Sequence, residues 1–214
     1  IFNSDGSEAM MCGNGSRCVG KFVYDKGLTE KKSVTLETLS GIKILNLHVE
    51  NGKVESVSVD MGKSQILTLG GNTTPFVNQP ITAKGITMNG TAVSMGNPHL
   101  VFFVENAEIF DVASVGPAFE HHPWFENRTN VEFAQILSPA KIRMRVWERG
   151  SGITMACGTG ACATFAAAKE CGLVNGKTTL VLDGGELQIE NSSTNGDVIM
   201  TGPAQTVFEG KIEI

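Results

Sequence analysis

Segments in which hydrophobic and polar residues alternate occur in the same order in two parts of the chain. Such alternation is typical of strands with one buried face, and an Asn-Gly pair between two of them predicts a tight hairpin. In each part, two strand-like segments are followed by an Asn-Gly turn and by a third strand-like segment. In the first part these features are 34–41, 42–50, Asn51-Gly52 and the segment that ends at Gly62. In the second part they are 178–185, 187–191, Asn195-Gly196 and the segment that ends at Gly202. The pattern predicts an internal duplication.

A helix-like run precedes the strands in each part, and it follows the same short motif. The motif is a cysteine followed by Gly-x-Gly, and the run ends at a Gly-Leu pair 15 residues after the cysteine. A glycine suits the left-handed conformation that ends many helices. The sequences are Cys12-Gly13-Asn14-Gly15 with Gly27-Leu28, and Cys157-Gly158-Thr159-Gly160 with Gly172-Leu173. We therefore expect helices at 13–26 and 159–171, each with a thiol at its N-terminus.

The two predicted helices differ in polarity. In the first, we expect an apolar stripe that faces the core and a polar face that points away from it. The stripe holds Cys18, Val19, Phe22 and Val23, and the polar face holds Arg17, Lys21 and Asp25. The second helix is apolar nearly all round over Ala161–Ala168, which is typical of a helix buried on every side. We expect short β-rich segments to wrap it like a barrel.

The two parts are unequal in length. A long run of strand-like segments precedes Cys157, at 91–94, 101–104, 131–137 and 142–147, whereas few residues precede Cys12. We expect a fragment of a longer protein whose first half lacks its leading strands. The predicted lobes are 1–60 plus 203–214 for the first and 61–202 for the second. We expect a final strand at 206–214 to return to the first lobe, because its alternation needs a sheet partner.

The composition is that of a globular protein with its own core. Of 214 residues, 41% are hydrophobic and 18% are charged. The net charge of −5, without any basic block, argues against nucleic acid and anionic membrane surfaces as partners. Five cysteines without a Cys-x-x-Cys pair favour free thiols in a reducing compartment over a disulfide framework. We therefore expect a cytoplasmic protein.

A cysteine at a helix N-terminus is placed for acid/base chemistry. The unpaired N–H groups and the helix dipole stabilise a thiolate there and lower the pKa of the thiol. The same N–H groups form an anion site that suits a carboxylate. If the turns of Cys12 and Cys157 face one another, a thiolate on one face and a thiol on the other could remove and return a proton at one carbon.

Other interpretations of these motifs stay open. Gly158–Ala163 fits the dinucleotide pattern G-x-G-x-x-A, with Asp183 at the end of a following strand, and would indicate a Rossmann-type oxidoreductase. A zinc site with His121-His122 lacks the usual ligand spacing. The cysteines could all be structural in a non-catalytic binding module, and we expect that role for three of them. Those three are Cys18, Cys162 and Cys171.

Several further motifs follow one another along nearly the whole chain. They are Asn3–Ala9, Met11–Cys18, Met95–His99, Arg128–Phe133, Trp147–Gly152 and Ala156–Ala163. Together they resemble the diaminopimelate epimerase family, whose fold is similar to that of proline racemase. The resemblance implies an α/β (α+β) fold of two pseudo-symmetric lobes, each a β-barrel wrapped around a central helix, with the active site between them. It also implies an isomerase that converts LL-diaminopimelate to meso-diaminopimelate in lysine and peptidoglycan precursor biosynthesis, without pyridoxal phosphate, metal or other cofactor.

The resemblance assigns roles to individual residues. It implies that Cys12 and Cys157 are the two acid/base groups and that His99 is a supporting catalytic residue. Glu148 is expected near the reacting ammonium, also as a catalytic group, and Arg149 near the distal carboxylate. Backbone amides of the two turns are expected to hold the reacting carboxylate, and amide side chains to grip the distal amino acid group. The turn residues are Gly13, Asn14, Gly158 and Thr159, and the amide side chains are Asn3, Asn97 and Asn130.

Specificity and assembly stay open within the resemblance. The nearest rival is another cofactor-independent racemase of the same fold, although proline racemases carry His where Asn14 stands. We expect diaminopimelate as the small-molecule partner, with no nucleic-acid or membrane partner. Whether the protein forms a homodimer is not decided by the sequence.

Overall fold

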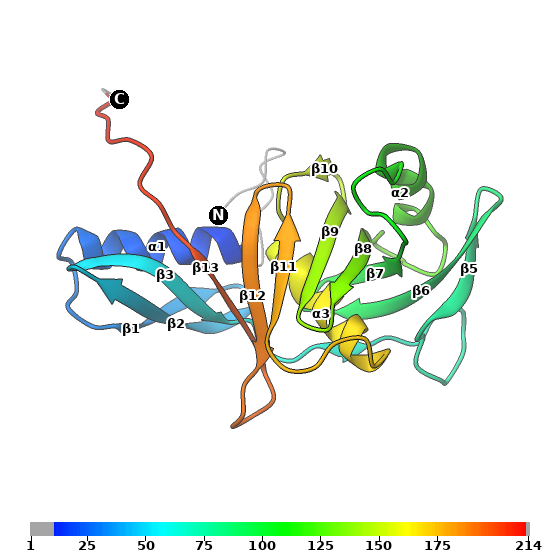
Figure 1. Ribbon diagram of the computed structural model, residues 1–214, viewed down its shortest axis with the longest axis horizontal. Helices are drawn as coiled ribbons and strands as arrows, with labels where there is room; N and C mark the ends of the chain where they lie inside the picture. The colour runs from blue at the N-terminus through cyan, green and yellow to red at the C-terminus, as the bar shows by residue number, and fades with distance from the viewer. Residues whose placement is uncertain (1–10, 213–214) are drawn as a thin grey trace. The chain divides into compact units, whose positions relative to one another are not determined.

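The computed structural model describes residues 11–212 (Figure 1). These residues form two compact units. The first unit holds the described residues up to Asp60 and those from Thr201 onward, and the second unit is Met61–Met200. The strand β13 (Val198–Pro203) crosses the boundary between them. The protein is of the mixed α/β class, with a large mixed sheet, as the sequence predicts at that level.

The first unit consists of one helix against antiparallel strands. Its elements are α1 (Gly13–Asp25), β1 (Ser33–Thr38), β2 (Gly41–Glu50) and β3 (Lys53–Asp60), and the end of β13 lies next to β3. β2 and β3 form a hairpin through Asn51 and Gly52, whose φ angles are 48° and 74°. The Asn-Gly hairpin prediction is therefore confirmed. α1 packs against β2 and β3.

α1 buries a different face from the one its hydrophobic stripe predicts. The buried residues are Gly13, Ser16, Arg17 and Gly20. Phe22 of the expected stripe is 56% exposed, whereas the Arg17 guanidinium reaches Pro203 O through Nε at 3.2 Å. A Cβ atom on Gly20 would lie 2.8 Å from Cδ2 of Leu47, so the absence of a side chain lets the helix approach the sheet. The predicted orientation is wrong because small residues together with Arg17, and not the largest apolar ones, form the packing face.

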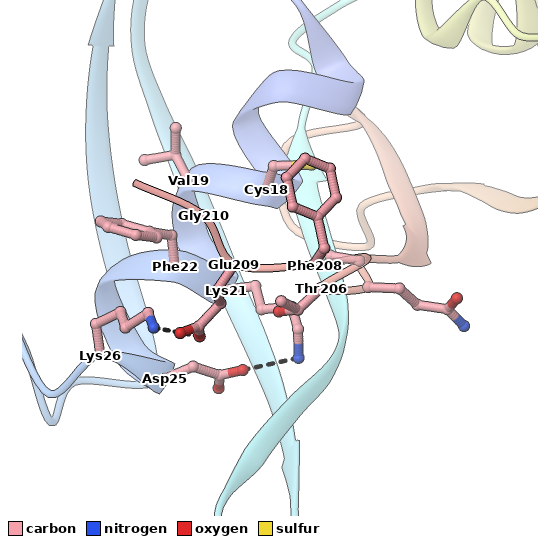
Figure 2. A pocket seen from close by; sticks show the side chains of 12 residues that line it. Cys18, Val19, Lys21, Phe22, Asp25, Lys26, Thr206, Phe208, Glu209 and Gly210 are labelled. Carbon is pink, nitrogen blue, oxygen red and sulfur yellow. Dashed lines mark hydrogen bonds and ion pairs between the residues drawn. The ribbon is translucent and has the colours of Figure 1, made fainter. Parts of the chain in front are cut away.

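The segment after β13 runs beside the outer face of α1. A groove of about 630 Å³ lies between them, and Figure 2 shows Phe22 and Phe208 at its two sides. Lys26 of the helix forms an exposed ion pair with Glu209. The predicted strand at 206–214 is wrong over 206–212, where the chain has no strand and Val207 and Phe208 are more than 80% exposed. Residues 213 and 214 lie outside the described residues.

The second unit contains the mixed part of the sheet. The strand order is β13-β12-β11-β9-β8-β7-β6-β4, with β10 on β9 and β5 on β6. The pairs β7–β8 and β9–β11 are parallel, whereas β8–β9 and β11–β12 are antiparallel. The elements are β4 (Gln65–Ile66), β5 (Gln79–Ala83), β6 (Ile86–Ser94), β7 (Pro98–Phe103), α2 (Val112–Glu120), β8 (Asn130–Ser138), β9 (Lys141–Glu148), β10 (Gly152–Thr154), α3 (Gly158–Glu170), β11 (Thr178–Leu182) and β12 (Gly185–Asn191).

α3 is the buried centre of the second unit. Every residue from Gly160 to Ala168 is buried, as the all-round apolar sequence predicts. The helix contacts β6, β7, β8, β9, β11 and β12. A second layer of core lies between the sheet and α2, where Phe102, Phe119 and Phe133 stack or tilt against one another. Closure of these strands into a barrel stays a prediction.

The strand register brings the polar residues of the second unit to neighbouring positions. His99 of β7 pairs with Asn130 of β8, and Glu132 of β8 pairs with Val146 of β9, two residues before Glu148. No helix within 11–212 is long and apolar enough to cross a membrane.

Candidate active site

The two thiol turns have the same local structure. Cys12 and Cys157 are the N-cap residues of α1 and α3, with φ and ψ of −132° and 110° and of −129° and 111°. In each turn the backbone N–H three residues later donates to Sγ, from Gly15 and from Gly160, and both distances are 3.4 Å. The sulfur therefore occupies the position of the oxygen in an ordinary N-cap.

The ends of the two helices also correspond. Each helix spans 13 residues. Leu28 N–H donates to Val23 O at 2.9 Å and Leu173 N–H donates to Ala168 O at 2.8 Å, which is the Schellman arrangement. The glycines before these leucines have φ of 69° and 68°. The predicted repeat of cysteine, helix and Gly-Leu is confirmed at the level of local structure.

The environments of the two thiols differ. Cys12 is half-buried, whereas Cys157 is buried with 6% of its surface exposed. Burial raises the pKa of Cys157 well above that of an ordinary thiol, and the charge of Glu148 raises it further. Hydrogen bonds from Thr159 and Gly160 act in the opposite direction. The expectation that the helix N-terminus lowers the pKa is wrong for Cys157, because loss of water outweighs the helix N–H groups.

Asn97, His99 and Thr159 join the Cys157 turn through a chain of contacts. Thr159 Oγ1 lies 3.5 Å from Cys157 Sγ, and Asn97 Nδ2 donates to the same Oγ1 at 3.5 Å. The other end of the Asn97 amide, Oδ1, lies 3.1 Å from His99 Nε2. His99 is fully buried, so it can act on a substrate only through its neighbours. The structure thus brings four sequence-predicted residues into one cluster.

Asn130 joins the start of β7 to the turn that follows β9. Its Oδ1 accepts the backbone N–H of Arg149 at 2.9 Å, and its Nδ2 donates to Pro98 O at 3.1 Å. Among the described residues, one amide hydrogen and one oxygen lone pair of Asn130 have no hydrogen-bond partner, so both are available to a ligand. Glu148 is half-buried and accepts the hydroxyl of Thr154 from β10. Arg149 is exposed, with Nη1 donating to Asn127 O.

Glu120 holds the turn that carries Glu148 and Arg149. This residue ends α2, and its carboxylate is 5% exposed. Oε2 accepts the indole N–H of Trp147 at 2.7 Å, and Oε1 accepts Gly150 N–H at 2.9 Å. Burial acts to raise the pKa of Glu120, but these hydrogen bonds and the charges of nearby cations lower it overall. The carboxylate is therefore a fixed anchor for this turn.

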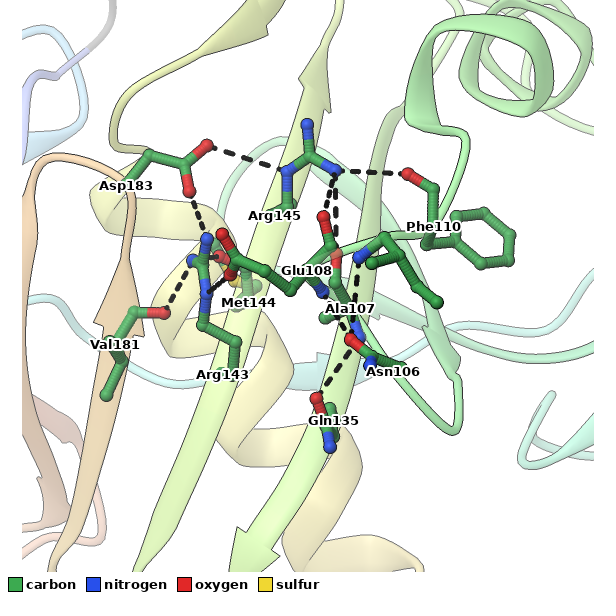
Figure 3. A network of polar contacts seen from close by, with 11 residues as sticks. Asn106, Ala107, Glu108, Phe110, Gln135, Arg143, Met144, Arg145, Val181 and Asp183 are labelled. Carbon is green, nitrogen blue, oxygen red and sulfur yellow. Dashed lines mark hydrogen bonds and ion pairs between the residues drawn. The ribbon is translucent and has the colours of Figure 1, made fainter.

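The β11–β12 turn is held by a separate network of charges. Figure 3 shows Arg143 and Arg145 of β9 directed toward Asp183 of this turn, and Arg145 also donates to Phe110 O at 3.0 Å. The next residue, Gly184, donates its N–H to Met155 O at 2.7 Å, two residues before Cys157. The acid that the dinucleotide interpretation needs is thus engaged in ion pairs.

The remaining predicted residues lie in or before the first unit. Asn14 sits in the first turn of α1, and its Oδ1 is buried without a hydrogen-bond partner in the part of the chain that the structure describes. Gly13 is buried. Asn3 lies outside the described residues. Asn14 therefore offers a free acceptor close to Cys12.

The other cysteines and histidines form no further centre within 11–212. None of the five cysteines forms a disulfide within the described residues; Cys162 is buried, Cys171 is half-buried and Cys18 is exposed. His122 accepts a hydrogen bond from Trp124 N–H. No group of three or more His, Cys, Asp or Glu side chains in the described residues is arranged to hold a metal ion.

Glu132 and Glu120 were missed by motif reasoning. Glu132 is fully buried, and its Oε1 lies 2.6 Å from His99 Nδ1. A charged residue between Val131 and Phe133 in an apolar strand was the available signal, because such a position faces the core. Nothing in the sequence near Glu120 indicates its contacts with β9.

Comparison with known proteins decides the family. A family model described as diaminopimelate epimerase matches residues 1–67 and 91–207. The chain belongs to the diaminopimelate epimerase family. Its activity is that of an amino acid epimerase, an isomerase of lysine biosynthesis. The resemblance seen in the sequence motifs is confirmed.

A curated relative agrees with this assignment, and two solved structures share the fold. The diaminopimelate epimerase of Phocaeicola vulgatus is 56% identical over 220 residues, which cover 100% of this chain and 78% of the relative. A PhzF-family phenazine biosynthesis protein from Bacillus anthracis has a TM-score of 0.70 at 15% identity. The match covers 99% of this chain and 79% of the B. anthracis chain. A probable proline racemase from Agrobacterium radiobacter K84 has a TM-score of 0.67 at 18% identity, covering 97% and 70%. The latter two show that this chain shares the fold of these proteins.

Proposed function

We propose that Cys12 and Cys157 are the two acid/base groups that invert one α-carbon of diaminopimelate. The observation that carries this proposal is the shared geometry of their turns, in which each sulfur caps a helix and accepts a glycine N–H at 3.4 Å. Two such groups on opposite faces of the carbon would take its proton from one side and return another from the other side. The product is the epimer, so LL-diaminopimelate becomes meso-diaminopimelate.

The protonation states follow from the surroundings of the sulfurs. Because burial raises the pKa of Cys157, this residue starts as the thiol and acts as the acid. Cys12, which is less buried, acts as the base in the same direction. After one turnover the proton has moved from Cys157 to the substrate, and Cys12 holds the proton that it removed. The reverse reaction uses the opposite pair of states.

The N-terminal turns of α1 and α3 hold the reacting carboxylate in this proposal. The first N–H groups of a helix have no partner within the helix and attract an anion. These groups belong to Gly13 and Asn14 in one turn and to Gly158 and Thr159 in the other. Negative charge that spreads into the carboxylate during proton removal is stabilised by the same N–H groups.

Polar side chains recognise the two ammonium groups and the distal carboxylate. Glu148 receives the reacting ammonium, and its position is fixed by Thr154. Arg149 pairs with the distal carboxylate as a bidentate donor. His99 supports Cys157 through Asn97 and Thr159. The distal amino acid group is bound by Asn3, Asn97 and Asn130.

The proposal extends to the fold of each unit, to cofactors, to location and to assembly. Each unit closes strands around its own helix, which the contacts of α3 with six strands support. The proton transfers use side chains alone, so no cofactor takes part. The five cysteines, none of which forms a disulfide within residues 11–212, support a reducing, cytoplasmic location. Assembly into a homodimer stays an open alternative to a monomer.

Serine variants of the two thiols test the proposal. Cys12→Ser and Cys157→Ser should each lower the epimerisation rate by about 10²–10⁴-fold, because serine is a poor base near neutral pH. Serine is itself a good N-cap, so both helices should remain folded. The measurement is deuterium incorporation from solvent at the α-carbon of LL-diaminopimelate.

The exposed thiol supplies the control. Cys18→Ser changes a thiol on the outer face of α1 and should leave the rate unchanged. Each single variant should still eliminate a β-leaving group from the one stereoisomer whose α-proton faces the remaining thiol. Near wild-type epimerisation by either Cys12→Ser or Cys157→Ser would overturn the two-base assignment.

A further inference from the structure

Glu132 lies in the interior of the second unit, beside the Cys157 turn. Its side chain is fully buried, and Oε1 lies 2.6 Å from His99 Nδ1. Oε2 is buried and has no hydrogen-bond partner among residues 11–212. A Cβ atom on Gly160 would lie 2.7 Å from Oε1, so the carboxyl group reaches the first turn of α3. Full burial with one oxygen unpaired among the described residues is unusual for a glutamate side chain.

The contacts of His99 show which of its ring atoms carries hydrogen. Asn97 Nδ2 donates to Thr159 Oγ1, so Oδ1 is the atom that faces His99 Nε2 at 3.1 Å. A carbonyl oxygen only accepts, and Nε2 therefore carries the hydrogen. In a neutral imidazole Nδ1 is then an acceptor, and it needs a donor on Glu132 Oε1.

The unpaired oxygen favours the neutral form of Glu132. A carboxylate facing an imidazolium would bury two charges while one carboxylate oxygen lacked any donor, and such burial is strongly unfavourable. A carboxylic acid places its O–H on Oε1 and leaves Oε2 as an uncharged carbonyl oxygen, which is far less unfavourable to bury. Burial also raises the pKa of Glu132, and the charge of Glu148 adds to this, although contacts with His99 oppose it.

We infer that Glu132 is a positioning residue of the epimerase site and works as a neutral acid whose O–H starts a one-way chain of hydrogen bonds to Cys157. Glu132 O–H donates to His99 Nδ1, and His99 Nε2–H donates to Asn97 Oδ1. Asn97 Nδ2–H donates to Thr159 Oγ1, which leaves the hydroxyl hydrogen free to donate to Cys157 Sγ. The inference rests on the proposed role of Cys157.

The chain of donors adjusts Cys157 in two ways. First, the Cys157 thiolate accepts hydrogen bonds from the hydroxyl of Thr159 and from the N–H of Gly160, which stabilise its charge against the effect of burial. Second, a neutral Glu132 adds no negative charge beside the sulfur, and Glu148 is then the nearby carboxylate that opposes the thiolate. Glu132 thereby keeps the buried thiol able to exchange its proton.

Two near-isosteric variants separate the neutral acid from a carboxylate. In Glu132→Gln, the amide N–H can donate to His99 Nδ1 as the acid does, and no charge is present in either form. In Glu132→Met, the shape is similar but the donor is lost. The measured quantity is the midpoint of the pH dependence of Cys157 alkylation by iodoacetamide, followed by mass spectrometry in the wild-type enzyme and in both variants.

If Glu132 is a neutral acid, the midpoint pH of Cys157 alkylation should differ between the two variants in a definite order. The midpoint of Glu132→Gln should stay close to that of wild type, and that of Glu132→Met should rise by about one pH unit, because the hydroxyl of Thr159 is no longer directed at the sulfur. If Glu132 were a carboxylate, Glu132→Gln would remove a nearby negative charge and lower the midpoint by about one unit or more. That lowering, or an unchanged midpoint in Glu132→Met, would overturn the inference.

Nitrogen-15 NMR of His99 in the wild-type enzyme tests the same point without any substitution. The inference predicts a neutral ring with hydrogen on Nε2 alone near neutral pH, and an imidazolium spectrum would contradict it. This holds even if Glu132→Met fails to fold. Both measurements are made without turnover, so they determine the protonation state of Glu132 whatever the role of Cys157. An active Cys157→Ser enzyme would overturn only the proposed role of Cys157.

Discussion

Gly160 marks the closest approach between the thiol turn and the buried acid. A Cβ atom there would lie 2.7 Å from Glu132 Oε1 and 3.2 Å from Cys157 Sγ. We expect Gly160→Ala to destabilise the protein by about 1–3 kcal/mol through overpacking, which outweighs the better helix propensity of alanine. Equilibrium urea unfolding measures this change in the free energy of unfolding.

A double-mutant cycle identifies the cause. In a Glu132→Ala background the nearest clash is absent, so Gly160→Ala should be less harmful by about 0.5–3 kcal/mol. Strictly additive effects would show that the contact with Glu132 is not responsible.

At the scale of residues, the sequence predicted the local structure of the thiol turns but not the residues that surround them. The duplicated Cys-Gly-x-Gly motif identified both thiols, since a local spacing decides which residue caps the helix. The state of Cys157 could not be predicted in this way, because its pKa depends on burial and on the charge of Glu148, which β9 brings close. Glu132 became visible only when the strand register placed it beside His99.

α2 contributes to the site through its last residue. Glu120→Gln should lower the free energy of unfolding by about 1.5–3 kcal/mol at neutral pH, because hydrogen bonds to a charged acceptor are lost. The amide NH2 group also places donors opposite the N–H of either Trp147 or Gly150, which then loses its acceptor. Epimerisation should slow as well, since the turn that carries Glu148 and Arg149 loosens.

The pH dependence of this difference has a definite sign. The pKa of Glu120 in the folded protein is lowered from its ordinary value of 4.5, so its contribution is fully present above that value. The difference between wild type and Glu120→Gln should therefore shrink as the pH falls below about 4.5 and through the folded pKa. Glu126→Gln, an exposed change in the following loop, should show neither effect.

At the scale of elements, positions were easier to predict than packing faces. The predicted helices at 13–26 and 159–171 agree closely with α1 and α3, because their caps are local signals. The buried face of α1 was not predicted, since a glycine that permits close approach leaves no trace in hydrophobic periodicity. The alternation at 206–212 indicated a strand, but alternation alone does not supply a neighbouring strand.

The whole molecule contains a natural comparison between two helices of equal length and similar caps. α3 is buried over Gly160–Ala168, whereas α1 exposes Cys18, Val19 and Phe22. Amide hydrogen exchange follows local opening, which is rarer in a fully packed element. We expect the α3 amides to exchange far more slowly than those of α1 when measured by mass spectrometry. Equal rates in the two helices would show that both open only when the whole protein unfolds.

The sulfur that we propose to react, Cys157 Sγ, is also the sulfur that caps α3. A thiolate accepts a hydrogen bond more strongly than a thiol, so deprotonation and tightening of the first helical turn favour one another by the same free energy. An electrophile that alkylates Cys157 leaves a thioether, which is a weak acceptor for the Gly160 N–H. Covalent capture would therefore uncap α3 and cost about 0.5–2 kcal/mol of helix stability. Alkylating inactivators of this kind would therefore destabilise the first turn of α3 as well as block the thiol.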